Sequence, residues 1–352
     1  MSHGGKAMPK LTISLDQCMP GMRVAEAVRN LDTGLIYIGE NQELTSETIE
    51  ILKNLQFDEV TILVNTWDDV WKITKETREN YKKCTDAVQA LFNQLSNDNI
   101  IDYEGFKSVK SQMKESFKDN YKIIGCINLF KYADSYTYTH SINVALLSML
   151  IGKWMKYSDH IVESLLIAGL LHDIGKMKID PTILNKPDKL TESEFEEVKQ
   201  HSRYSYELIQ NNNSISLDIK IGILMHHEKM DGSGYPYGVY SENINDIAKV
   251  LAVADVYDAM LSERPYQKKH SPFDVMQLMQ EGVFGKLDTK ILLTFLTNIA
   301  SYYIGTYVLL SDGQIGEVVA INPACVYRPI IKVQDKYINL YSDRSINIIE
   351  LA

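Results

Sequence analysis

Residues 165–177 read LLIAGLLHDIGKM, an apolar run that ends in a His-Asp pair followed by Gly-Lys. The run predicts a buried helix from about residue 162 to residue 171, with Gly175 as the natural helix stop. A histidine and an aspartate at the end of a buried helix lie on the same edge. His172 can then bind one cation while Asp173 bridges two, so the stretch predicts a metal site in a helical domain.

Further candidate ligands recur at intervals of roughly one helix hairpin. They are His140, His201, His226, His227 and Asp255. Such spacing lets each helix of a bundle contribute one side chain to a shared interior point. Asp255 lies within IAKVLAVADVYDAM, where the buried face of the predicted helix is otherwise apolar. A carboxylate there carries a desolvation penalty of several kcal/mol unless a cation balances it.

Packing offers an alternative explanation for each of these residues taken singly. A histidine near an apolar face can be a hydrogen-bonded core residue, and Asp255 can pair with an arginine or cap a neighbouring helix. The joint pattern favours a metal site instead. His-Asp stands directly before Gly-Lys, His-His-Glu stands directly before a Gly-rich turn, and an aspartate interrupts an apolar helix.

The types of ligand limit which metals can bind and which reaction they can support. Imidazole with carboxylate and no thiolate suits Fe, Mn, Co, Ni or Zn, and it excludes a Cu(I) site. Two such cations about 3.5–4 Å apart are the usual arrangement for phosphoryl transfer, with a bridging hydroxide as the nucleophile. Lys176 would place an ammonium near a phosphate oxygen; the alternative is a cation that stabilises a helix C-terminus.

Patterning along the 352 residues divides the chain into four parts. Residues 1–66 read as a small α+β module, and residues 67–120 as polar connector helices. Residues 121–300 have helical periodicity apart from one Gly-rich loop, and residues 301–352 alternate β-branched runs with turns. The predicted fold is therefore mainly α: a helical bundle with a dinuclear metal site, flanked by a small α+β module and a small β-rich module.

Several elements of the two small modules can be predicted individually. A Ser/Thr cap signal starts a helix over residues 45–55. Strand-like runs in the first module cover residues 11–15, 22–27, 35–38 and 60–64. Strand-like runs in the last module cover residues 307–310, 315–322, 330–333 and 346–351. The last set predicts a small β-barrel or meander.

The composition limits which partners the protein can bind and where in the cell it can lie. An apolar fraction of 45% supplies a packed core without disulfide bonds. The net charge of −10 and the lack of a basic stripe argue against a nucleic acid polymer as partner. Four cysteines far apart in sequence, no 18-residue apolar run and no apolar segment near the N-terminus predict a cytoplasmic protein without a membrane span or secretion signal.

The motifs of the helical region resemble those of the bacterial HD-GYP family. They are HDIGK from His172, HHE from His226, DGSGYP from Asp231, VADVYDA from Val253 and RPY from Arg264. The resemblance covers about residues 121 to 285. It implies a helical bundle of the HD-domain type, and a metal-dependent phosphodiesterase that hydrolyses cyclic di-GMP to linear pGpG and, in some members, onward to GMP.

The resemblance also implies roles for individual residues. One metal would be held by His140, His172, Asp173 and Asp255. The other would be held by Asp173, His201, His226 and His227. Lys176 would contact the scissile phosphate. The dinucleotide pocket would be lined by Gly234, Tyr235, Pro236, Asp258 and Arg264.

Two of the implied residues have an alternative explanation from the sequence. Arg264 offers a planar fork suited to a guanine edge or a phosphate, and the alternative is a surface ion pair. Glu228 is expected to orient a ligand histidine or a water molecule, and the alternative is a solvated charge at a helix end.

The sequence departs from the family pattern at two positions. Some members supply an extra carboxylate for a third metal one turn before the first histidine, where this chain has Tyr136, with Asp134 further away. A third cation and efficient hydrolysis of pGpG to GMP are therefore not expected. A basic residue commonly three positions after Arg264 is Gln267 here, and we expect Lys268 to take its place in the pocket.

Other functions remain open at the level of sequence. The chain could be a slow or non-catalytic cyclic dinucleotide receptor, or a hydrolase of another cyclic dinucleotide such as 3′,3′-cGAMP. The complete ligand set and Lys176 favour an enzyme. The same ligands accept several metals, of which Fe or Mn is the first expectation and Ni, Co or Zn the next. The flanking modules leave a homodimer or signalling partners open.

Overall fold

The structure is a computed structural model of the 352-residue chain. It describes residues 10–352 with several gaps. The gaps are residues 16–17, 19–21, 30–32, 34, 41, 43, 64–72, 99–101, 131–135, 187, 263–270 and 283–284.

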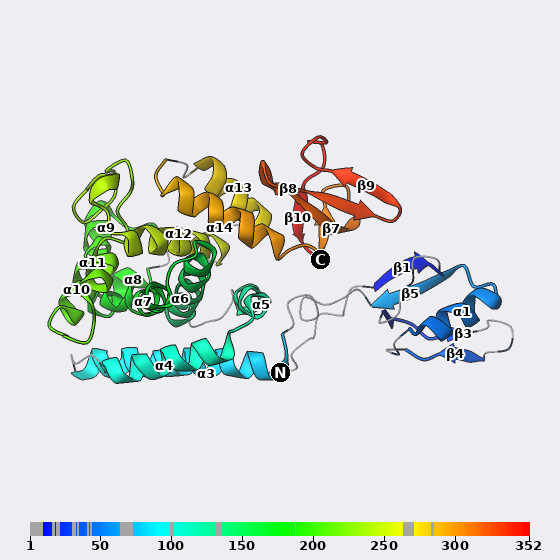
Figure 1. The fold of residues 1–352 in the computed structure, drawn as a ribbon, viewed down its shortest axis with the longest axis horizontal. Coiled ribbons are helices and arrows are strands. Elements are labelled where there is room, and N and C mark those ends of the chain that lie inside the picture. The colour runs from blue at the N-terminus through cyan, green and yellow to red at the C-terminus, as the bar shows by residue number, and fades with distance from the viewer. Residues whose placement is uncertain are drawn as a thin grey trace. The chain divides into compact units, whose positions relative to one another are not determined.

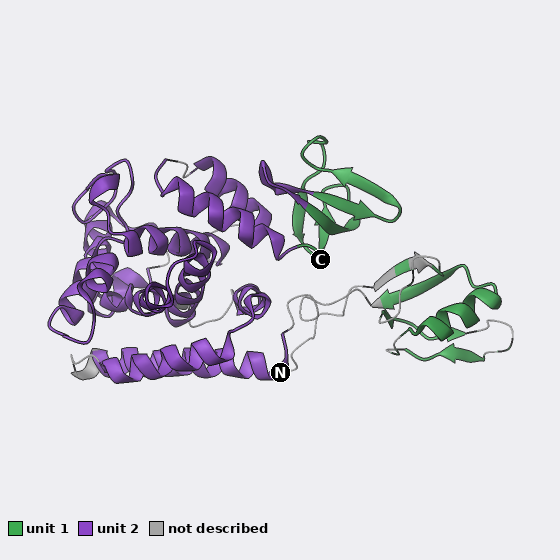
Figure 2. Cartoon of the chain, viewed as in Figure 1, with its two compact units in different colours: residues 1–72, 304–320, 330–352 green, residues 73–303, 321–329 purple. Residues whose placement is uncertain are grey.

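The chain divides into two compact units (Figure 2). One unit takes in residues 1–72, 304–320 and 330–352, and the other takes in residues 73–303 and 321–329. The helices over residues 75–116 belong to the same compact unit as the helical bundle.

Among the residues that the structure describes, the N-terminal module has one helix and five short strands (Figure 1). They are β1 (Lys10–Ser14), β2 (Arg23–Val24), β3 (Val28–Arg29), β4 (Ile36–Ile38), α1 (Ser46–Asn54) and β5 (Glu59–Leu63). Strands β1, β5 and β2 form an antiparallel sheet, and β3 pairs with β4. Helix α1 starts at a capping box, because Thr45 and Thr48 each accept the other's backbone N–H. The sequence anticipated β1, β4, α1 and β5, whereas the strand predicted over residues 22–27 is reduced to β2 and β3 was not predicted.

The helical unit is a bundle that begins with two long amphipathic helices (Figure 1). Its α-helices are α3 (Lys75–Asp98), α4 (Tyr103–Ser116), α5 (Asn120–Phe130), α6 (Tyr136–Trp154), α7 (Asp159–Leu171), α8 (Pro181–Leu184), α9 (Glu192–Lys199), α10 (His201–Ile209), α11 (Leu217–Leu224), α12 (Asp246–Leu261), α13 (Pro272–Gly282) and α14 (Thr289–Ser301). Its 3₁₀ helices are η2 (Ile174–Lys178) and η3 (Ser241–Asn243). No helix of the described residues is long and apolar enough to cross a lipid bilayer.

Helices α6, α7 and α12 form the centre of the bundle. All three pack on one another, and α11 packs on α7 and α12. They are apolar nearly all round, as expected for helices buried on every side. Gly169 allows α7 to approach α6 closely, because a Cβ there would lie 2.5 Å from the Cα of Ala145.

Gly175 has a different role from the predicted helix stop. Helix α7 ends at Leu171, and Gly175 lies inside η2 without a positive φ. Its N–H donates to Ser205 Oγ over 2.8 Å, and a Cβ at this position would overlap the carbonyl oxygen of His201. The glycine is therefore required by the close packing of η2 on α10.

The C-terminal module is a five-stranded antiparallel sheet. Its strands are β6 (Tyr307–Leu310), β7 (Ile315–Asn322), β8 (Cys325–Val333), β9 (Lys336–Asn339) and β10 (Ile348–Leu351), in the order β10-β6-β7-β8-β9. The sequence anticipated all of them except β9. This strand lies at the sheet edge and is mostly exposed, so it lacks the apolar alternation that marks the others.

Candidate metal centre

The structure brings the seven predicted ligands together inside the helical unit. They come from the middle of the bundle and from the ends of its helices. His140 lies on α6, His172 and Asp173 at the α7–η2 junction, His201 at the start of α10, His226 and His227 just after α11, and Asp255 on α12. All are buried except His227, which is partly exposed.

Three groups of three residues can each hold a metal ion: two share no residue, and the third, made of His172, Asp173 and His226, takes one residue from each of those two. The first group is His140, His172 and Asp255, and one ligand atom of each lies within 4.8 Å of the others. In this group His140 Nε2 lies 3.1 Å from Asp255 Oδ1. The second group is His201, His226 and His227. The Nε2 atom of His201 lies 3.3 Å from that of His226 and 3.1 Å from that of His227.

Asp173 lies between the two groups and turns one oxygen toward each. Its Oδ2 atom is 3.4 Å from His140 Nε2 and 3.3 Å from His172 Nε2. Its Oδ1 atom is 3.3 Å from His201 Nε2. A carboxylate in this position can bridge two cations, which is the arrangement expected of two-metal sites.

Three of the histidines are oriented by the helix that precedes each of them. The Nδ1 atoms of His172, His201 and His226 donate to the carbonyl oxygens three residues earlier, over 2.8, 2.7 and 2.6 Å. Each carbonyl lies in the last turn of a helix, where backbone oxygens have no partner within the helix. The bond fixes the tautomer, so each ring keeps the lone pair on Nε2 for a metal.

Burial keeps the imidazoles of His201, His226 and His227 neutral. It lowers the pKa of His201 to about 4 and that of His227 to about 3, because a buried ring disfavours the charged form. The pKa of His226 lies well below its usual range, because of burial and then of the neighbouring His227. Near pH 7 a metal therefore does not compete with a proton for these rings.

The two aspartates are ionised in spite of their burial. Desolvation alone would raise the pKa of Asp173, yet the neighbouring His172 imidazole and the Lys176 ammonium hold it well below its usual range. The ammonium of Lys176 contacts Asp173 Oδ2 directly. Burial also opposes ionisation of Asp255, and its contact with the His140 imidazole holds its pKa below its usual range.

Two buried atoms of the cluster have no hydrogen-bond partner among the residues that the structure describes. They are His172 Nε2 and Asp173 Oδ1. Burying a polar atom without a partner costs about 1–3 kcal/mol, so native proteins seldom leave one unsatisfied. Both atoms face the other ligand candidates. The nitrogen and oxygen donor set and these two atoms fit divalent metal ions.

The Gly-Tyr-Pro loop folds back on the His226-His227 segment. The Tyr235 N–H donates to the His227 carbonyl over 3.2 Å, and the two rings stack with centroids 4.6 Å apart and planes 30° apart. Gly234 is required here, because a Cβ would overlap the His227 carbonyl oxygen. Pro236 follows Tyr235 through a cis peptide bond. Tyr235 therefore covers a ligand candidate, a contact that the sequence did not predict.

Glu228 has neither of its two expected roles. Its side chain is 3% exposed, so it is not a solvated charge. Its carboxylate accepts the backbone N–H groups of Tyr237, Gly238 and Val239, over 2.7, 3.2 and 3.1 Å. The residue therefore holds the Gly-Tyr-Pro loop in place and does not orient a ligand histidine.

Asp258 does not line a pocket. It is fully buried, and its oxygens accept from His140 Nδ1 over 2.7 Å and from Asn143 Nδ2 over 2.8 Å. Asp258 lies one helical turn after Asp255 on the same face of α12. Its side chain therefore points at the ligand histidine His140 and not at a substrate pocket. Arg264, Lys268 and Asp134 lie outside the described residues, as does the side chain of Tyr136.

Two polar residues that the sequence did not single out support the cluster. Ser205 Oγ donates to the His172 carbonyl over 2.7 Å and accepts the N–H of Gly175. Asn143 links Asp258 to the hydroxyl of Tyr81. Asn143 lies three residues after His140 on an apolar helix, which is a signal that could have revealed it, since buried amides need partners.

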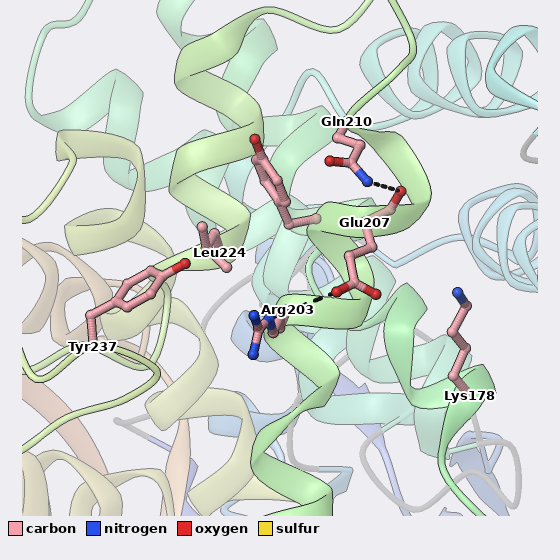
Figure 3. Close-up of a pocket in the computed structure, with 7 residues that line it drawn as sticks. Lys178, Arg203, Glu207, Gln210, Leu224 and Tyr237 are labelled. Atoms are coloured by element: carbon pink, nitrogen blue, oxygen red, sulfur yellow. Dashed lines mark hydrogen bonds and ion pairs between the residues drawn. The ribbon is translucent and has the colours of Figure 1, made fainter.

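A surface pocket of about 520 Å³ lies beside α10 (Figure 3). Its lining residues are Lys178, Arg203, Tyr206, Glu207, Gln210, Leu224 and Tyr237. Arg203, Tyr206 and Glu207 on α10, with Gln210 just after it, follow the spacing of one helix face, and His201 lies on a different face. None of the seven ligand candidates lines this pocket, so it is separate from the metal cluster.

Comparison with protein families places this cluster in a known class. Residues 126–291 match the family model described as HD domain, and this span includes all seven ligand candidates. That part of the chain is an HD domain, whose family implies bound divalent metal. The HHE and DGSGYP motifs also lie within this matched span, in keeping with the resemblance to the HD-GYP family.

Several curated proteins are similar to this chain. A cyclic di-GMP phosphodiesterase of Pseudomonas aeruginosa is 32% identical over 247 residues, which are 70% of this chain and 59% of that protein. A cyclic di-GMP phosphodiesterase of Thermotoga maritima is 34% identical over 60% of this chain and 54% of its own length. A 3′3′-cGAMP-specific phosphodiesterase of Vibrio cholerae is 33% identical over 50% of this chain and 41% of its own.

This chain thus spans little more than half the length of the first two of these relatives. Among solved structures, an HDG"Y"P protein from Bdellovibrio bacteriovorus aligns with 82% of this chain and 98% of its own. Its TM-score is 0.46 and its sequence identity is 13%.

Proposed function

We propose that this chain is a metal-dependent phosphodiesterase that hydrolyses cyclic di-GMP to linear pGpG. The observation that carries the proposal is the position of Asp173, with one oxygen toward each of two groups of metal ligands. Two adjoining metal sites are the usual arrangement for cleaving a phosphodiester. The names of the relatives from Pseudomonas aeruginosa and Thermotoga maritima supply the substrate.

We assign the ligands as two sets that share Asp173. One set is His140, His172, Asp173 and Asp255. The other is Asp173, His201, His226 and His227. Imidazole and carboxylate donors favour Fe or Mn, and they also accept Ni, Co or Zn. When bound, such a pair would activate a water molecule and offset the charge of the phosphate in the transition state.

The remaining residues bind and orient the substrate. We assign Lys176 to a non-bridging oxygen of the scissile phosphate, because its ammonium already lies at the cluster and its side chain is 21% exposed. Gly234, Tyr235 and Pro236 would form one wall of the dinucleotide pocket. We keep Arg264 and Lys268 as proposed contacts to a guanine or a phosphate. We also propose a cytoplasmic location, where isolated cysteines stay reduced.

A product assay combined with metal analysis tests the proposal. Purified protein is loaded anaerobically with Fe(II) or Mn(II), and its metal content is measured. Single-turnover reactions with cyclic di-GMP are then analysed for pGpG. We expect two metal ions per chain and stoichiometric pGpG. Binding of cyclic di-GMP without any pGpG would reject the enzyme and favour a receptor.

A second substrate is favoured by one specific comparison. The relative from Vibrio cholerae is named as specific for 3′3′-cGAMP and is as similar in identity as the other two. Rates for cyclic di-GMP and 3′,3′-cGAMP at equal concentration decide between the two substrates. If kcat/KM is at least tenfold higher for 3′,3′-cGAMP than for cyclic di-GMP, the substrate is 3′,3′-cGAMP and the proposal of cyclic di-GMP is wrong.

A further inference from the structure

A continuous line of buried hydrogen bonds runs from helix α3 to the metal cluster. Tyr81 on α3 donates its hydroxyl to Asn143 Oδ1 over 2.5 Å. Asn143 Nδ2 donates to Asp258 Oδ1 over 2.8 Å, and Asp258 Oδ2 lies 2.7 Å from His140 Nδ1. All four side chains are at most 2% exposed, so water does not compete for these bonds.

The direction of each bond in this line is fixed by the next one. The Asp258 carboxylate can only accept, so His140 donates from Nδ1 and the Asn143 amide turns its NH₂ group toward Asp258. The amide oxygen then faces Tyr81, which must donate. Burial, and then the charge of Asp258, raise the pKa of the Tyr81 phenol well above its usual value, so the hydroxyl keeps its proton.

The Tyr81 ring is held by aromatic neighbours from other segments. It stacks on Phe130 at the end of α5, with centroids 4.5 Å apart and planes 1° apart. It also meets the edge of Phe117, which follows α4, at 6.2 Å. Replacing Tyr81 with phenylalanine would keep these contacts and remove only the hydroxyl.

From this geometry we infer that Tyr81 is a positioning residue for the metal centre, acting on His140 through Asn143 and Asp258. The inference rests on the proposed function in that it assumes metal binding by His140. Tyr81 lies outside residues 126–291, the part of the chain that matches the HD domain model. Helix α3 is the first element of its compact unit, so any displacement of α3 would reach a metal ligand through this bond.

Tyr138→Phe is a matched control for Tyr81→Phe. The Tyr138 hydroxyl also links α6 to α3, because it donates to Asn93 Oδ1 over 3.3 Å, yet this bond is exposed and does not lead to a ligand. Asp258→Asn tests the middle of the line, because it replaces the carboxylate that accepts from His140 and keeps the size of the side chain.

Metal titration of the metal-free protein tests the inference independently of catalysis. Mn(II) or Co(II) is added to the wild type and the three variants in a calorimeter, and thermal unfolding of the metal-free forms is recorded. We expect Asp258→Asn to lower the affinity for one of the two ions by about 10- to 100-fold. We expect Tyr81→Phe to weaken binding of the same ion by about 3- to 10-fold, since both Asn143 and Asp258 lie between Tyr81 and His140. Tyr138→Phe should bind both ions as the wild type does.

The outcomes separate this inference from the proposed function. The positioning role is wrong if Tyr81→Phe binds both ions as tightly as Tyr138→Phe does. It is also wrong if Tyr81→Phe lowers the affinity for both ions equally and lowers the unfolding temperature. If the wild type binds two ions and Tyr81→Phe lowers the affinity for one of them, the positioning role is supported even if no pGpG is formed. A wild-type chain that binds no metal overturns both.

Discussion

The ligand histidines at helix ends and the ligand histidine within a helix are held in different ways. His172, His201 and His226 each follow a helix and donate to the carbonyl three residues earlier. His140 lies inside α6, where the backbone oxygens are taken by the helix, and it donates to the Asp258 side chain 118 residues away. Local backbone geometry therefore orients three ligands, and tertiary structure orients the fourth.

His227 represents a third case. No described residue within hydrogen-bonding distance accepts from its Nδ1 atom, which lies 3.7 Å from Asp255 Oδ2. Its ring is covered by Tyr235, whose loop is held by Glu228. The comparison teaches that ligands placed by a helix end need little further support, whereas His140 and His227 depend on side chains that substitution can remove.

The largest effect is expected where the two ligand groups meet. Asp173→Ala removes an oxygen from each proposed metal site, so both ions should be lost and turnover should fall by about 10³-fold or more. Metal content and pGpG formation measure the two losses. Wild-type rates in this variant, with metal present, would refute the shared ligand.

A smaller effect is expected from Lys176, whose ammonium contacts Asp173 in the cluster. Lys176→Met should lower kcat by about 10²- to 10³-fold, because a charge that stabilises the transition state is lost. Both metals should stay bound, since Lys176 is not a ligand. The control is Lys178→Met, an exposed neighbour, which should keep nearly wild-type kcat. Equal rates for the two variants would remove Lys176 from catalysis.

Glu228→Gln should lower the free energy of unfolding by about 1–3 kcal/mol, because the amide cannot accept all three backbone N–H groups that the carboxylate holds. Urea denaturation of the metal-free protein measures the change. Glu242→Gln, at an exposed position, should change the free energy of unfolding by no more than about 0.5 kcal/mol. An unchanged midpoint for Glu228→Gln would show that its carboxylate does not hold the loop.

The smallest effect is expected at Tyr235, where two substitutions separate the role of the hydroxyl from that of the ring. Tyr235→Phe keeps the ring that stacks on His227, so the affinity for both metals should stay within about twofold of the wild type. Tyr235→Ala removes the ring, and the affinity for one ion should fall by about 10-fold. Metal titration compares the two variants. If both bind metal equally well, stacking does not position His227.

The sequence predicted the fold, and which side chains meet inside it, for a physical reason. Aspartates and histidines within apolar helices conflict with burial, and such conflicts stand out in a single sequence. The structure brings all seven of these side chains together. Apolar periodicity likewise predicted most elements, and it missed β9 because an exposed edge strand has no buried face.

The sequence could not predict contacts between segments far apart in the chain. Gly175 looks like a helix stop, and only the packing of α10 against it shows why a side chain is excluded. Asp258 and Glu228 stand in recognisable motifs, yet their partners depend on tertiary structure. Tyr81 carries no signal at all, because a tyrosine on an amphipathic helix looks like any other core residue.

A crystal structure of the protein soaked with Mn(II), with anomalous diffraction recorded, tests the central claim most directly. The account predicts two peaks about 3.5–4 Å apart, one beside His140 and His172 and the other beside His201 and His226, with Asp173 in contact with both. A single peak, or two peaks that Asp173 does not join, would contradict it.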